Sequence, residues 1–305
     1  MNNFSFKEPL VRSFSLDWLE FTWEVENTRL DPHDFEWYIE RSESSEGPWD
    51  PIAGPFSDRY RFIDNRVNLL HRWRQLYYRV RSTEKADDTN ISYSSAATLE
   101  AEPDLIAQEI QLLERTVWRE FTGRACYLFP VRTFGQYCPH CMDAEGLGST
   151  FRKLRSNCIT CYDTQFVRGY LNPIEIFIQF DPSPKTQQPQ GPGETQQSNT
   201  SARMGNFPLV KPRDIIVEPE NRRWRVVQVS STERLRAKVH HELSLHEIVK
   251  GDIEFQLPID VGDLRDLDPS PERNFSNPQN LEGFEDEGMI GALKAYGYDN
   301  DRKLF

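Results

Sequence analysis

The sequence predicts a mainly β protein with one α-helix, divided into a β-sandwich, a helix with a zinc module, a small β unit and an acidic tail. Three observations lead to this fold class. Short runs alternate apolar and polar residues between turn signals, which is typical of strands with one buried face. One segment instead repeats its apolar residues at helical spacing. Four of the five cysteines form two CxxC pairs, which favour a structural zinc ion.

Residues 1–103 are expected to form the sandwich. The strand candidates are rich in aromatic and β-branched residues and lie at 13–23, 35–41, 75–81 and 91–99. A Gly-Pro-Trp turn and a Tyr-Arg-Val-Arg strand follow these first two runs, and the whole order resembles a fibronectin type III domain. The resemblance implies a binding or spacer module without catalytic residues. Core packing is the expected role of its tryptophans, which are Trp18, Trp23, Trp37 and Trp49.

A helix is expected from about Asp104 to Phe121, with Asp104 as its N-cap. Four apolar residues recur at helical spacing: Ile106, Ile110, Leu113 and Val117. Three more widen the apolar face: Leu105, Leu112 and Trp118. A face this wide predicts burial between two partners, one of them the zinc module and the other a neighbouring subunit.

The zinc module is expected within residues 104–170. Its ligands are Cys138, Cys141, Cys158 and Cys161, and sixteen residues separate the two pairs, as in zinc ribbons and knuckles. Four thiolates close a tetrahedral Zn²⁺ sphere and leave no position for an activated water, so the site is predicted to be structural. Two disulfides and a redox role are the alternatives. His140 lies inside the first pair and is expected to be a solvated turn residue.

The fifth cysteine, Cys126, stands among apolar residues and is expected to be a buried free thiol. An odd number of cysteines together with CxxC pairing favours a reducing compartment. The sequence starts with no basic-then-apolar signal, and no apolar run approaches the roughly 20 residues that span a bilayer. We therefore expect a soluble protein made in a cytoplasm.

The net charge of −12 argues against a general nucleic-acid binder, because phosphate contacts need clustered lysine and arginine. Basic residues nevertheless surround the cysteines: Arg119, Arg124, Arg132, Arg152, Lys153, Arg155 and Arg168. A solvated rim on the zinc module is one interpretation of this cluster. The other is a zinc-ribbon protein that binds nucleic acid or acts in transcription.

Residues 171–259 are expected to form a second, smaller β unit that closes a small barrel. The strand candidates lie at 172–180, 214–217, 224–229, 237–243 and 252–257, with hairpin chemistry at 218–222. Residues 181–206 are polar and rich in glutamine and proline, which predicts a flexible loop. His240, His241 and His246 are expected to be satisfied or exposed rather than metal ligands.

Residues 260–305 form an acidic arm rich in Asp, Asn, Pro and Gly. Its few apolar residues, among them Leu304 and Phe305, have no local core to join. Ordering on a partner as a docking arm and simple disorder are both open interpretations.

Short motifs around the cysteines are the basis of a second resemblance. They are the two CxxC pairs, the run at 162–166, Gly169, Tyr170, Pro173, and 214–217 leading to 222–226. Together they resemble structural proteins of tailed bacteriophages that form the neck, meaning the connector, adaptor or stopper rings between portal and tail. The resemblance covers roughly residues 105–259.

This second resemblance implies a non-enzymatic virion protein that is assembled in the host cytoplasm as a hexameric or dodecameric ring. Its partners would be portal, tail or stopper proteins, and DNA would pass an acidic channel without specific binding. The sequence contains no Gly-rich phosphate loop, nucleophile elbow or paired-carboxylate signature that would point to an enzyme.

Overall fold

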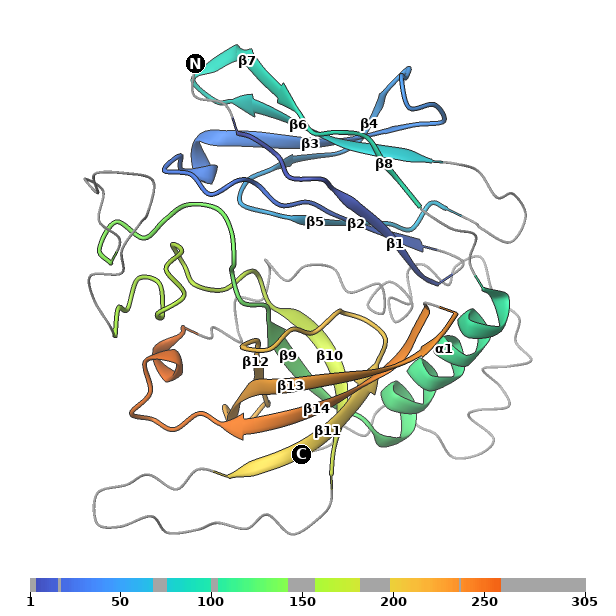
Figure 1. The fold of residues 1–305 in the computed structure, drawn as a ribbon, viewed down its shortest axis with the longest axis vertical. Coiled ribbons are helices and arrows are strands. Elements are labelled where there is room, and N and C mark those ends of the chain that lie inside the picture. The colour runs from blue at the N-terminus through green and yellow to red at the C-terminus, as the bar shows by residue number, and fades with distance from the viewer. Residues whose placement is uncertain are drawn as a thin grey trace, which may run out of the picture. The chain divides into compact units, whose positions relative to one another are not determined.

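The computed structural model describes residues 4–15, 18–67, 76–99, 104–141, 157–181, 198–235 and 237–258. They all belong to one compact unit, Met1–Asp268. This part of the chain is mainly β with one α-helix, as the sequence predicts (Figure 1). The acidic arm at 260–305 and most of the glutamine-rich segment lie outside the described residues.

The first part of the chain forms two antiparallel sheets (Figure 1). One has the order β1-β2-β5, with β1 at Leu10–Ser15, β2 at Trp18–Thr22 and β5 at Arg61–Asp64. The other has the order β4-β3-β6-β7, and a short β8 also pairs with β6. Its strands are β3 (Phe35–Ser42), β4 (Asp50–Phe56), β6 (Tyr77–Glu84), β7 (Asp87–Tyr93) and β8 (Ala97–Thr98).

Two of the predicted strands are wrong in this region because each contains two strands. Residues 13–23 are divided between β1 and β2, which pair antiparallel. Residues 91–99 are divided between β7 and β8. An alternating pattern has the same period on both sides of a short interruption, so it does not reveal where the strand ends.

Aromatic residues fill the space between the two sheets. Trp23 and Trp37 are fully buried and cross edge to face with ring centroids 6.2 Å apart. Trp18 is equally buried but packs toward the second half of the chain, against Phe207. Trp49 is only half-buried and lies 4.3 Å from the Arg79 guanidinium. The expected core position is therefore correct for three of the four tryptophans and wrong for Trp49.

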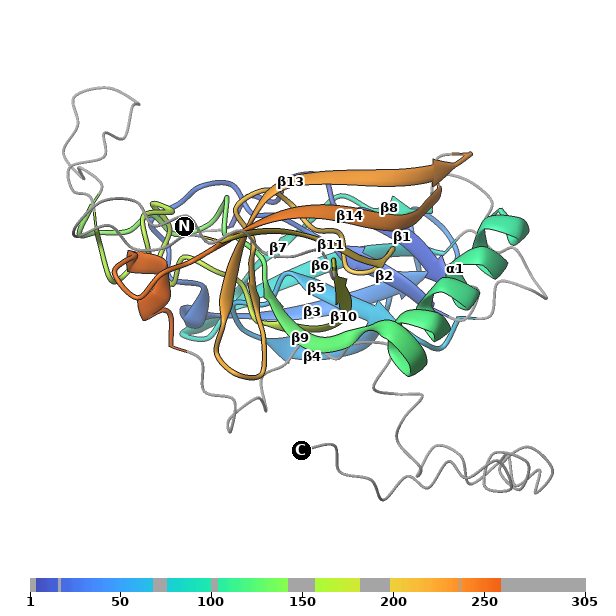
Figure 2. The same ribbon diagram turned by 90° about the horizontal axis from the view of Figure 1, so that it is seen from below.

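Six antiparallel strands then close a barrel in the order β10-β11-β14-β13-β12-β9 (Figures 1 and 2). They are β9 (Arg124–Phe129), β10 (Ile174–Phe180), β11 (Asn199–Gly205), β12 (Ile215–Val217), β13 (Arg223–Arg234) and β14 (Ala237–Glu247). The sequence predicts a small barrel from the later strands. It does not predict the two strands that complete it.

Three assignments in the barrel region need correction. β9 comes from the segment grouped with the zinc ligands, and β11 comes from the segment 181–206 expected to be a flexible loop. β11 carries only two buried side chains, Ala202 and Met204, so its apolar signal is weak. The predicted strand at 252–257 is instead a single 3₁₀ turn, Ile253–Gln256; a second such turn covers Pro32–Asp34.

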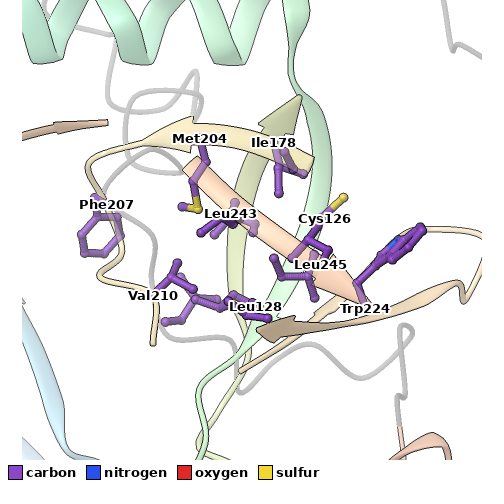
Figure 3. Packing of buried hydrophobic residues seen from close by; sticks show 14 of the residues in the cluster. Cys126, Leu128, Ile178, Met204, Phe207, Val210, Trp224, Leu243 and Leu245 are labelled. Carbon is purple, nitrogen blue, oxygen red and sulfur yellow. The ribbon is translucent and has the colours of Figure 1, made fainter. Parts of the chain in front are cut away.

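The barrel interior is filled by side chains that alternate inward along the strands (Figure 3). Ile174, Ile176 and Ile178 of β10 all point inward and are at most 1% exposed. Cys126 belongs to the same cluster and is free, as predicted. Burial raises the pKa of its thiol to about 12, so Cys126 remains protonated and unreactive.

The α-helix of the described chain, α1, covers Leu105–Val117 and continues through one wider turn over Trp118–Thr122. The Asp104 carboxylate accepts a hydrogen bond from the Ile106 N–H at 3.1 Å, which confirms the predicted N-cap. α1 lies along the outside of the barrel and contacts β14, β1 and β11 (Figures 1 and 2). Within the described residues, no helix is both long and apolar enough to cross a membrane.

Candidate metal centre

The four predicted zinc ligands converge in one cluster between β9 and β10. The sulfur atoms of Cys138, Cys141, Cys158 and Cys161 all lie within 4.8 Å of one another. The Cys141 sulfur is 3.3 Å from that of Cys138 and 3.1 Å from that of Cys161, and 3.8 Å separates Cys138 from Cys158. A tetrahedral zinc ion with Zn–S bonds of about 2.3 Å places its sulfurs about 3.8 Å apart. The cluster therefore has the dimensions of a four-thiolate metal site.

The disulfide alternative does not fit this geometry. All five cysteines are free. A disulfide bond is about 2.05 Å long, and the shortest sulfur separation in the cluster, 3.1 Å, is well beyond it. Each sulfur also has more than one sulfur neighbour, which suits ligands of a shared ion better than two separate bonds.

The chain builds each half of the site as a tight turn held by backbone hydrogen bonds. In the first half, the Cys141 N–H donates to the Cys138 carbonyl, and the Cys138 N–H donates to the Gln165 carbonyl. In the second half, the Tyr162 N–H donates to the Cys158 carbonyl at 2.8 Å. Asp163 closes this turn, because its carboxylate accepts from the Cys158 N–H at 3.2 Å.

Gly169 lets the chain pass close behind the second turn. Its φ is +66°, and a Cβ at this position would lie 2.7 Å from the Cys161 carbonyl oxygen. Both conditions favour glycine, because other residues are strained at this φ and the neighbouring backbone leaves no room for a side chain. Close packing of this segment thus fixes the backbone of a ligand residue.

The thiols differ in acidity because they share a buried site. Burial raises the pKa of Cys141 and of Cys161. Burial opposes ionisation of Cys158 as well, but hydrogen bonds from Cys141 and from the backbone at Cys161 and Thr160 together lower its pKa to about 6. A bound divalent cation would favour the thiolate at all four positions.

The surroundings of the cluster suit a structural role. Cys158 is 8% exposed and the other three sulfur ligands are 0% exposed, so solvent and substrate have little access. His140 is exposed and does not belong to the cluster, in agreement with its predicted place in a turn. Four thiolates already satisfy a tetrahedral ion, which leaves no site for chemistry on the metal.

The connection that carries the cysteines also contacts the sandwich. Arg132 pairs with both carboxylate oxygens of Asp58 at 2.8 Å, and both side chains are 2% exposed. Phe134 packs edge to face against Tyr60, with ring centroids 4.8 Å apart. Thr28 exchanges backbone hydrogen bonds with Gly135 and Tyr137. Sequence patterns give no sign of these contacts, because their partners are distant in the chain.

The same connection packs against the barrel. Tyr162 and Tyr170 join a buried cluster with Val131, Ile215 and Val217. A metal ion held by the four cysteines would therefore fix a segment that contacts both the sandwich and the barrel. An ion in this site would act as a cross-link between chain segments.

The four described members of the basic cluster predicted around the cysteines all form ion pairs with carboxylates. Arg132 and Arg168 pair with Asp58, Arg124 with Glu218 and Arg119 with Glu120. The three remaining basic residues, Arg152, Lys153 and Arg155, lie outside the described residues. The described arginines thus serve ion pairs within the chain, which weakens the argument for a phosphate-binding surface.

The histidines of β14 form no metal site with other residues in the described part of the chain. His241 is 1% exposed, and its Nδ1 lies 2.8 Å from the Ser231 hydroxyl. Burial, with a smaller effect of Lys238, lowers the pKa of His241 to about 4. His240 and His246 are partly exposed.

Comparison of the sequence with protein-family models and with curated proteins finds no match.

Proposed function

We propose that this protein is a non-enzymatic structural component of the neck of a tailed bacteriophage, stabilised by a structural Zn²⁺. The observation that carries the structural role is the closed, buried cluster of four cysteines in the segment that contacts both sandwich and barrel. A closed thiolate sphere cross-links chain segments and offers no open coordination position. Zinc is the proposed ion because tetrahedral four-sulfur sites suit it well.

The N-terminal part is proposed to be a fibronectin type III-like module. Its strand order supports this, because one sheet joins β1, β2 and β5 while the other joins β4, β3, β6 and β7. This is the arrangement of a Greek-key sandwich, in which consecutive strands are divided between two sheets. Such a module would project from the assembly as a binding or spacer unit.

The neck assignment rests on the motifs at 105–259, and the closed barrel lies within that range. A rigid barrel can be repeated around a symmetry axis, so the architecture agrees with a ring of hexameric or dodecameric order. Portal and tail or stopper proteins are the proposed partners, in a virion assembled in the host cytoplasm. The net charge of −12 suits a channel that lets DNA pass without binding it.

Metal analysis of the purified full chain tests the structural part of this proposal. We expect about one zinc per chain, the stoichiometry of a four-thiolate site. Cys158→Ser should lose the metal, whereas Cys126→Ala should keep it because Cys126 lies in the barrel core. Full metal content in Cys158→Ser would contradict the zinc site.

Electron microscopy of the chain mixed with a portal or tail preparation tests the neck role. We expect closed rings or density bound to the particle. A zinc-containing chain that forms no ring and instead binds duplex DNA with a steep salt dependence would favour the alternative of a zinc-ribbon nucleic-acid-binding protein.

A further inference from the structure

A helix that packs on the core of a monomer buries apolar side chains and exposes polar ones, whereas α1 buries two glutamines and exposes several apolar side chains. Toward the barrel and β1, α1 buries Gln108 and Gln111 beside Ala107 and Trp118. The other face carries six apolar side chains that are 43–70% exposed, and Glu109, Thr116 and Glu120 are exposed among them. The six are Leu105, Ile106, Leu112, Leu113, Val117 and Phe121. A helix on the surface of a finished monomer normally turns its apolar stripe inward. The sequence predicts that the apolar face packs on the zinc module and on a neighbouring subunit. In the described chain α1 packs on β14, β1 and β11 instead, and these six side chains remain exposed.

The tip of the β13–β14 hairpin extends this apolar surface. Arg234 pairs with Asp104 at 3.1 Å, which holds the tip beside the first turn of α1. Leu235, the next residue, is 78% exposed. We call Leu235 and the six exposed residues of α1 the α1 patch. Seven large apolar side chains expose on the order of several hundred Å², the size that marks an interaction site on a soluble protein.

The composition of the remaining surface indicates what covers this patch. The other large apolar residues that the described chain exposes are Ile91 and Tyr93 on β7, Ile159 in the zinc segment and Val227 on β13. They are scattered over three regions, so none of these regions offers an apolar surface of comparable size. Among the described surfaces, the one that matches the α1 patch in size and chemistry is the same patch on another copy.

We propose that the α1 patch is a two-fold interface between two copies of this chain. In such an isologous contact both copies use the same surface. If residue i of the first copy contacts residue j of the second, then residue j of the first also contacts residue i of the second. The patch suits this symmetry, because Leu113 lies midway between Leu105 and Phe121. Antiparallel pairing brings Leu113 against its own counterpart and sets the Leu105 end of one helix beside the Phe121 end of the other. It also sets the two helix dipoles in opposite directions.

The area agrees with a dimer of ordinary stability. A standard interface buries about 800 Å² on each partner, and the patch with the polar rim around it approaches this size. The proposal does not depend on the neck function. A two-fold contact pairs copies of the free protein, whereas a ring needs a head-to-tail contact through other surfaces.

Light scattering of the full chain after gel filtration tests the contact. The mass should be near twice the 35.7 kDa of one chain. Leu113→Asp should halve it, without loss of circular dichroism or zinc content, because Leu113 is 60% exposed. Val227→Asp is the matched control, since Val227 is 45% exposed but lies outside the patch, and it should remain dimeric. A monomeric wild-type chain at all soluble concentrations would overturn the proposal, and so would a dimer that Leu113→Asp leaves intact.

Cross-linking with a short bis-maleimide tests the symmetry. Leu113→Cys should cross-link to itself, because both copies present this residue at the axis. Leu105→Cys should not, since each lies about 12 Å from the centre along its own helix at 1.5 Å per residue. A mixture of Leu105→Cys and Phe121→Cys should cross-link. Wild type and Ser230→Cys, an exposed barrel position, are the controls. Self-cross-linking of Leu105→Cys without that of Leu113→Cys would overturn the antiparallel arrangement.

Discussion

At the scale of single residues, the four-cysteine cluster of the candidate metal site is the best-predicted feature of the chain. Each CxxC pair is a local turn, so spacing alone predicts that its two sulfurs converge. The residues that support the site are less visible in the sequence. Asp58 pairs with Arg132, which lies 74 residues later in the sequence. A single aspartate is part of no sequence pattern that would predict a buried partner so far away. Gly169 has a local signal, but the need for a positive φ becomes evident only in the structure.

Gly169→Ala should weaken the metal site without touching a ligand. The new Cβ would stand 2.7 Å from the Cys161 carbonyl, and the positive φ adds strain of about 1–2 kcal/mol. We expect a lower melting temperature and weaker zinc retention in competition with a chelator. Gly251→Ala is the control, because a methyl group at that position would meet no atom within 4 Å and the φ of Gly251 is not positive. Equal behaviour of the two variants would argue against the proposed constraint.

His241 should make stability fall in mild acid. Its pKa is lowered to about 4 in the folded protein, from about 6.5 in an unfolded chain. Above pH 6.5 the ring is neutral in both states and contributes nothing to the pH dependence. Between about 6.5 and 4 only the unfolded chain takes up the proton, so the free energy of unfolding falls as pH falls, by up to about 3 kcal/mol.

Asp214 acts in the opposite sense over part of this range. Burial raises the pKa of its carboxyl to about 6, although the backbone N–H groups of Lys211 and Val131 favour the charged form. The folded state therefore takes up this proton first, and stability rises as pH falls from about 6 toward 4. Urea unfolding of wild type and His241→Gln at several pH values separates the two effects. The variant should lose less stability on acidification, and parallel curves would show that His241 does not titrate as described.

At the scale of elements, alternation and helical spacing predict that strands and a helix exist but not what they pack against. The helix starts where its N-cap predicts, yet its apolar stripe faces away from the barrel and its glutamines face inward. Periodicity defines a stripe without saying which neighbour covers it. β11 escapes prediction for a related reason, since only Ala202 and Met204 turn into the core.

The contact between sandwich and metal-bearing segment should depend on the buried Asp58–Arg132 pair. Asp58→Asn keeps the size of the side chain but leaves the Arg132 charge without its buried counter-charge, which costs about 3–5 kcal/mol in comparable cases. Glu24→Gln is the matched control, because the Lys7–Glu24 pair is exposed and such pairs contribute less than about 1 kcal/mol. Denaturant unfolding should separate the two variants clearly. Similar losses of unfolding free energy in the two variants would mean that the buried pair contributes no more to stability than the exposed one.

At the scale of the whole molecule, the buried clusters differ in how closely they are connected to the four-cysteine segment. The barrel core is built from residues of the six barrel strands, from Phe207 and Val210 between β11 and β12, and from Phe14 and Trp18 of the sandwich strands. None of the four clustered cysteines belongs to it. The segment between β9 and β10 contributes Phe134 to the sandwich core and Tyr162 and Tyr170 to a third cluster. Loss of the ion should therefore affect the segment and its contacts before it affects the barrel.

Removal of the proposed zinc by a strong chelator should produce this graded response. Amide hydrogen exchange should accelerate at residues 130–141 and 157–172, where the backbone depends on the cysteine turns. Protection should persist in β10 and β14, whose hydrogen bonds and buried side chains belong to the closed barrel. Restoring zinc should reverse the change, and Cys158→Ser should show the accelerated pattern without chelator. If β10 and β14 lose protection together with the metal segment, the ion supports the fold as a whole, as in small domains that fold only with metal. That result would contradict a role limited to cross-linking this segment.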